Sequence, residues 1–153
     1  MSAEILSAQR AAVTTIAELT AGVSEEALHR RPAPGKWSIV EIIAHVAEDE
    51  LTSSWRYRQM IEHDGLPLLG FDQELWSRLG DYSSWTSRDA LDMYRLLRLA
   101  NVALLSRLTA AEWERSGNHA ERGPITVRSL AAHMAGHDRN HIEQIKRILA
   151  GGV

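Results

Sequence analysis

The chain has 153 residues, of which 44% are hydrophobic and 24% charged, with a mean hydropathy of -0.24 and a formal net charge of -3. This balance is typical of a soluble globular protein, and the length fits a single domain over residues 1–153. The mixed charges argue against a nucleic-acid partner, and the lack of a long apolar run or a basic N-terminal leader argues against a membrane or secreted protein, so we expect a cytoplasmic one.

The first half of the chain is expected to form two long helices. Apolar residues recur at helical spacing over residues 3–21. Ser24 then caps a short helical turn, and a proline-rich segment follows. Ser38 and the Glu41 three residues later form a capping box, so a second long helix is predicted from there to about Glu62.

The second half is expected to add two more long helices. A short helical excursion is predicted at residues 71–76, and a third long helix is expected to start near Ser87. Thr109 opens another capping box, residues 116–124 are expected to form a loop, and Thr126 caps the last helix. Four long helices joined by short turns predict an all-α fold, a four-helix bundle with short helices in the connections.

The last predicted helix carries histidines where its apolar stripe should continue. The apolar positions of that stripe are Val127, Leu130, Met134, Ile145 and Ile148. At the same three-and-four spacing, the two missing positions are His137 and His141. Residues four apart lie one turn apart on one helix face, so both imidazoles could reach one metal ion. A solvent-facing row that includes His133 is the alternative, but the stripe directs His137 and His141 inward, where unpaired imidazoles are costly.

The second predicted helix supplies further candidate ligands. His45 lies at the rim of its apolar face and could provide a third imidazole across the bundle, although a half-exposed core histidine is the plainer interpretation. Asp49, one turn later, is the nearest candidate for a fourth protein ligand, followed by Glu48 and Asp138. The acidic run from Glu48 to Glu50 is also what a solvated helix face would show.

Two separated motifs together resemble the DinB/YfiT-like metalloproteins. Residues 37–45 read WSIVEIIAH, and residues 137–144 read HDRNHIEQ. Members of that family are four-helix bundles in which one histidine of the second long helix and a His-x-x-x-His pair of the last helix hold a divalent metal. The resemblance extends over nearly the whole chain in length and helix order, and it implies that the metal ligands are His45, His137 and His141.

The resemblance also indicates a class of function. Characterised members of the family include transferases of low-molecular-weight thiols and thiol-dependent isomerases, which implies a thiol and a small electrophile as partners. Because the chain has no cysteine, such a thiol must come from a co-substrate. Zinc, nickel and iron all suit three imidazoles, which leave at least one coordination position for water or substrate. The alternatives are a metal-dependent hydrolase and a non-catalytic, stress-related metal- or small-molecule-binding protein. Many members of the family form dimers, so the resemblance also implies a homodimer.

Several polar and aromatic residues near the predicted site have two interpretations each. Trp76, Tyr82 and Trp85 cluster before the third long helix, where they could line a substrate pocket or pack the connection. Gln144 lies near the face of His141 and could line the site or belong to an ordinary polar rim.

Overall fold

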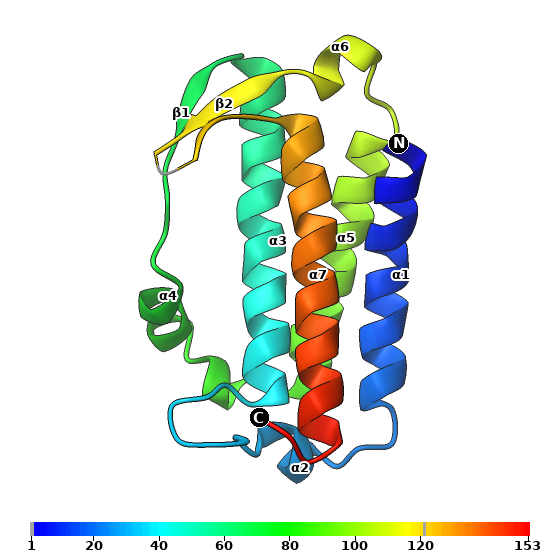
Figure 1. Ribbon diagram of the computed structural model, residues 1–153, viewed down its shortest axis with the longest axis vertical. Coiled ribbons are helices and arrows are strands. Elements are labelled where there is room, and N and C mark those ends of the chain that lie inside the picture. The colour runs from blue at the N-terminus through cyan, green and yellow to red at the C-terminus, as the bar shows by residue number, and fades with distance from the viewer. Residues whose placement is uncertain (1, 121) are drawn as a thin grey trace.

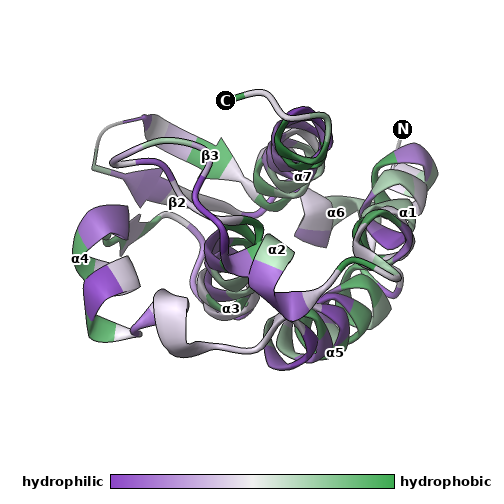
Figure 2. Ribbon diagram, turned by 90° about the horizontal axis from the view of Figure 1, so that it is seen from below, coloured by the Kyte–Doolittle hydropathy of each residue, from purple (hydrophilic) through white to green (hydrophobic). Residues whose placement is uncertain are grey.

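Four long helices form the bundle in the computed structural model, which describes residues 2–120 and 122–153 (Figure 1). The four helices are α1 (Ser2–Thr20), α3 (Ile39–Glu62), α5 (Ser87–Leu105) and α7 (Val127–Leu149). Both α3 and α1 pack against α5 and α7, so the helices surround one interior (Figure 2). The predicted all-α four-helix bundle is confirmed.

The order of the helices requires one long return connection. In Figure 1, α1 and α7 run in one direction, whereas α3 and α5 both run in the other. The chain must therefore travel back along the bundle between α3 and α5, and it does so along the outside of α3. This connection contains β1 (Leu66–Leu68), α4 (Gln73–Leu79) and the 3-10 helix η1 (Tyr82–Ser84).

Side-chain caps start the helices where the sequence predicts them. Ser38 and Thr126 begin α3 and α7 as capping boxes, since each side chain accepts from a backbone N–H three residues later. Ser24 caps the short α2 (Glu25–His29), and Thr109 caps α6 (Ala110–Trp113). The excursion predicted at residues 71–76 is α4, which begins two residues later and ends three residues later than expected.

A small sheet replaces the loop expected at residues 116–124, so that prediction is wrong. β2 (Ser116–His119) pairs with β3 (Gly123–Thr126) in antiparallel fashion and with β1 in parallel fashion. A Cβ atom at Gly117 would lie 2.7 Å from side-chain atoms of Leu68, so glycine allows the close approach of β1 to β2. These strands are too short and too rich in glycine and polar residues to show the alternation of apolar and polar residues that predicts a strand. They form by pairing with a distant segment.

The interior consists of two apolar clusters separated by a polar region. One cluster, which includes Ile42 and Ile145, lies toward α2, and the other, which includes Met60 and Leu130, lies toward the sheet. The buried polar residues between the two clusters include Gln9, His45, Asp49, Glu50, Arg98, Asn101 and Asp138. Among the described helices, none is both long and apolar enough to cross a membrane.

Candidate metal centre

The three histidines predicted as ligands converge between α3 and α7. The Nε2 atom of His137 lies 3.2 Å from Nε2 of His45 and 3.1 Å from Nε2 of His141. One ligand atom from each residue lies within 4.8 Å of the others, a spread that one metal ion can bridge. His137 and His141 stand one turn apart on α7, as the apolar stripe of that helix predicts, and His45 faces them from α3.

Neighbouring side chains orient two of the three rings. The Oε1 atom of Gln144 accepts a hydrogen bond from Nδ1 of His141 at 2.9 Å, which leaves the lone pair of that ring on Nε2, toward the other histidines. The indole of Trp37 packs against His45 with 4.9 Å between ring centroids. Gln144 therefore lies at the site, as the sequence suggests.

Burial keeps these imidazoles in the form that binds metals. His45 is 1% exposed, so its predicted place at a half-exposed rim is wrong: the ring is fully enclosed between helices. Burial lowers the pKa of His45 and of His137 to about 3, and it also lowers the pKa of His141. Neutral rings near neutral pH keep a free lone pair for a metal ion.

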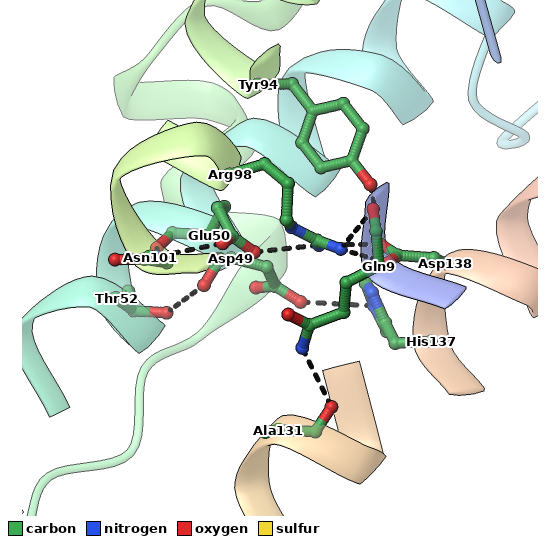
Figure 3. A network of polar contacts seen from close by, with 10 residues as sticks. All are labelled: Gln9, Asp49, Glu50, Thr52, Tyr94, Arg98, Asn101, Ala131, His137 and Asp138. Atoms are coloured by element: carbon green, nitrogen blue, oxygen red, sulfur yellow. Dashed lines mark hydrogen bonds and ion pairs between the residues drawn. The ribbon is translucent and has the colours of Figure 1, made fainter. Parts of the chain in front are cut away.

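Asp49 adds a carboxylate to the cluster. Its Oδ2 atom lies 3.1 Å from Nε2 of His137 (Figure 3) and 3.6 Å from Nε2 of His45. Its Oδ1 atom is buried without a hydrogen-bond partner, as is Nδ1 of His137. Burial raises the pKa of the Asp49 carboxyl to about 7. The three imidazole nitrogens are ligands that fit a divalent transition metal, and Asp49 adds a carboxylate oxygen beside His137 and His45.

The acidic run beside His45 is not a solvated face, so that interpretation is wrong. Glu50 is 1% exposed and accepts hydrogen bonds from Arg98 at 2.8 Å and from Asn101 at 2.8 Å. Glu48 accepts a hydrogen bond from the hydroxyl of Tyr82 at 2.6 Å. The run looks solvated in the sequence because the partners of these carboxylates lie far away along the chain.

Asp138 also differs from its expected role, because it points away from the histidines. Its carboxylate accepts hydrogen bonds from Arg98 at 2.6 and 3.1 Å and from Tyr94 at 3.0 Å (Figure 3). Arg98 also donates to the backbone oxygen of Gln9 and to Glu50, so one guanidinium connects all four long helices. Burial alone would lower the pKa of Arg98, but the two carboxylates outweigh burial and raise it.

The sequence contains a signal for this buried ion network. Tyr94, Arg98, Asn101 and Leu105 follow one another at the three-and-four spacing of a helix face, and all four are buried. Polar residues at core positions need partners inside the protein. A search for polar positions on the buried face of α5 would have found Arg98.

The aromatic residues of the return connection pack it against the bundle. Trp76 stacks on Phe71 with 4.6 Å between centroids, and Trp85 donates from Nε1 to the backbone oxygen of Gly80. Tyr82 is buried against Trp37, 6.3 Å between centroids. None of the three predicted wall residues lines the cavity at His137. The packing interpretation holds for Tyr82 and Trp85, whereas Trp76 lines a second cavity next to the first.

A cavity of about 200 Å³ reaches the cluster at His137 and Asp49. His133 also lines it, with its ring centroid 6.2 Å from that of His137. Away from the site, His29 contacts the backbone oxygen of Trp85 at 3.0 Å, and His63 is exposed. The cavity gives a small molecule access to His137 and Asp49.

A four-helix bundle with three histidines gathered between α3 and α7 defines a class of helical proteins with a candidate metal centre. Comparison with known sequences then places the chain within that class. The sequence model of the DinB superfamily matches residues 8–145, and the chain belongs to this superfamily.

The most informative relatives carry metal-related names. The chain is 26% identical over 135 residues to an Oceanobacillus iheyensis protein named "Putative metal-dependent hydrolase OB0413", covering 88% of this chain and 78% of that one. It is 23% identical over 115 residues to the Bacillus subtilis protein named "Putative metal-dependent hydrolase YfiT", covering 74% of this chain and 65% of that one.

Solved structures show the same fold. The structure of Bacillus subtilis YfiT, described as having an unusual four-helix bundle topology, superposes with a TM-score of 0.90 at 18% identity, covering 99% of this chain and 89% of that one. A mycothiol-dependent maleylpyruvate isomerase superposes with a TM-score of 0.75 at 12% identity, covering 95% of this chain and 60% of that one. At these identities, the two structures establish the fold alone.

Proposed function

We propose that this protein is a metal-dependent enzyme in which His45, His137 and His141 hold a divalent transition-metal ion. The observation that carries the proposal is the convergence of three neutral imidazoles, one buried and two half-buried, beside a carboxylate. Zinc, nickel and iron suit this donor set. The metal-dependent names of the relatives support the same conclusion.

The residues of the site divide the chemical work. A divalent ion held by His45, His137 and His141 would supply Lewis-acid chemistry that lowers the pKa of a nucleophile at the site. Gln144 fixes the tautomer of His141, and Trp37 restrains the ring of His45. Asp49 is placed to accept a proton, because its carboxylate lies 3.1 Å from His137 and its Oδ1 atom has no partner.

We further propose that the nucleophile is a low-molecular-weight thiol, which attacks a small electrophile in an S-transfer reaction. The chain contains no cysteine, so the sulfur must come from a second substrate. A neighbour of the same fold is named as a mycothiol-dependent isomerase, which supports thiol chemistry on this scaffold.

A hydrolase is the second candidate, with water in place of the thiol. The names of the sequence relatives favour it. The same groups would serve, since Asp49 can accept a proton from water as from a thiol. A non-catalytic metal- or small-molecule-binding protein is the third candidate. The homodimer and the cytoplasmic location stay predictions, which sedimentation and cell fractionation would test.

The test begins with metal analysis of protein purified without a tag, followed by rate measurements on the metal-loaded form. Glutathione, bacillithiol and mycothiol are each tested with monobromobimane, and p-nitrophenyl acetate is tested alone. We expect a metal-dependent rate that His137→Ala abolishes. Acceleration of ester cleavage without any thiol would favour the hydrolase, and no acceleration in any assay would favour the binding protein.

The variant Asp49→Asn tests whether Asp49 accepts a proton or binds the metal as a fourth ligand. If Asp49 accepts the proton, the variant should lose about 100-fold in rate and keep its metal affinity within a few-fold. A large loss of metal affinity would instead identify Asp49 as a ligand of a closed structural site, which would overturn the proposed catalytic role.

A further inference from the structure

The cavity beside the three-histidine cluster has two arginines and one carboxylate in its described lining. Asp49 and His137 belong to the cluster, whereas Arg56, Arg122 and His133 line the part nearer the sheet. Arg56 lies seven residues beyond Asp49 on α3, a rise of roughly 10 Å. His133 lies one turn before His137 on the antiparallel α7. The basic side chains therefore extend from the cluster toward the sheet end of the bundle.

Arg56 is held in place within this lining. It is half-buried, its Nη2 atom donates to the backbone oxygen of Leu69 at 2.6 Å, and its guanidinium carbon lies 5.8 Å from the ring centroid of Phe71. Among the described residues, no carboxylate forms an ion pair with Arg56. Burial lowers the pKa of this guanidinium, and the charge of Arg122 lowers it further despite the nearby Asp49. An enclosed cation without a paired anion is costly.

Arg122 approaches from the turn between β2 and β3. Its Nη1 atom lies 3.2 Å from Nε2 of His133, which can accept this hydrogen bond as a neutral ring. Burial lowers the pKa of His133, and the charges of Arg122 and Arg56 add to that effect. Within the described lining, Asp49 is the only acidic residue, and its carboxylate faces His137. The two guanidiniums thus share one small cavity with little negative charge.

We propose that Arg56 and Arg122 form a subsite for an oxyanion, a carboxylate or phosphate group, of a small substrate whose reacting atom lies at the three-histidine cluster. Guanidinium groups bind such oxyanions with paired, charge-assisted hydrogen bonds. The cavity of about 200 Å³ is smaller than the roughly 300–1,000 Å³ of sites for drug-sized ligands, which favours a small substrate. The position of the reacting atom rests on the proposed function, whereas the anion subsite itself does not.

The experiment titrates inorganic phosphate and, separately, acetate into metal-free and zinc-loaded protein at low ionic strength. Binding is followed by NMR through the side-chain Nε signals of the arginines, and the relative affinity of the two anions shows which oxyanion the subsite prefers. We expect Arg56→Gln and Arg122→Gln each to weaken binding at least about tenfold. Arg139→Gln removes the same charge from an exposed position of α7 outside the cavity lining and should leave binding unchanged.

His137→Ala separates the subsite from the metal centre. Anion binding that survives in this variant and in metal-free protein supports the subsite, even if no metal-dependent reaction is ever found. Binding that requires the metal and persists in both arginine variants would make the anion a metal ligand and overturn the proposal. If Arg139→Gln weakened anion binding by the same factor, the effect would come from the net charge of the protein, and the proposed subsite would be overturned. Because Arg122 is exposed on a turn, Arg122→Gln should fold even if Arg56→Gln does not.

Discussion

Two polar clusters lie next to each other inside the bundle, and they differ in how their charges are matched. Around Arg98, Glu50 and Asp138 place carboxylates within 2.8 Å of one guanidinium. Around His137, three neutral imidazoles and the Asp49 carboxylate lie together without such a cation. Both clusters contain buried polar atoms without a partner, Nε of Arg98 in the first and Oδ1 of Asp49 and Nδ1 of His137 in the second. The first cluster is a closed structural network, and the second is arranged for a ligand that the chain itself does not supply.

Consecutive residues link the two clusters. On α3, Asp49 joins the histidines and Glu50 joins Arg98 (Figure 3). On α7, His137 belongs to the histidine cluster, and the next residue, Asp138, binds Arg98. The ion network therefore fixes the rotation of α3 and α7 about their axes, and that rotation sets where the imidazoles point.

The largest predicted effect comes from breaking the closed network. Arg98→Met leaves two buried carboxylates without their cation, so the free energy of unfolding should fall by about 3–5 kcal/mol. Urea denaturation followed by circular dichroism measures this change. Arg95→Met, which removes an exposed arginine paired with Asp92 at 3.5 Å, should cost less than about 1 kcal/mol. Equal stability of the two variants would refute the structural role of the network.

Removing a histidine from the three-histidine cluster should weaken metal binding far more than it lowers the stability of the fold. His137→Ala should weaken divalent-metal binding at least about 100-fold, because it removes a central ligand. The metal-free variant should lose less stability than Arg98→Met, since it removes a neutral ring rather than the cation that pairs two buried carboxylates. Isothermal titration with zinc and thermal melts measure the two effects. His63→Ala, at an exposed position, serves as the control, and similar affinities in the two variants would remove His137 from the site.

The sequence predicts the parts of this molecule that depend on local pattern. Capping residues such as Ser38 and Thr126 fix the helix starts because each bonds to its own next turn. The three-histidine cluster follows from helix periodicity, which places His137 and His141 inward, and from the family resemblance, which adds His45.

The parts that were missed depend on contacts between distant segments. Glu50 appears solvated until α5 brings Arg98 against it. β2 contains too few residues for a strand pattern and forms only beside β1 and β3. The basic cavity is likewise invisible in sequence, since Arg56 and Arg122 approach it from different elements.

The smallest predicted effect concerns Gln144, which orients His141 but is not one of the three proposed ligands. Gln144→Leu keeps a side chain of similar size but removes the acceptor for Nδ1 of His141, so the ring can adopt the tautomer that protonates Nε2. Metal affinity should fall roughly tenfold, within the range seen when such partners of ligands are lost. Gln144→Glu retains an acceptor and should keep affinity at or above the wild-type value. Titration of both variants with zinc tests this, and a loss of the same size in Gln144→Glu would show that Gln144 acts by packing rather than by orienting His141.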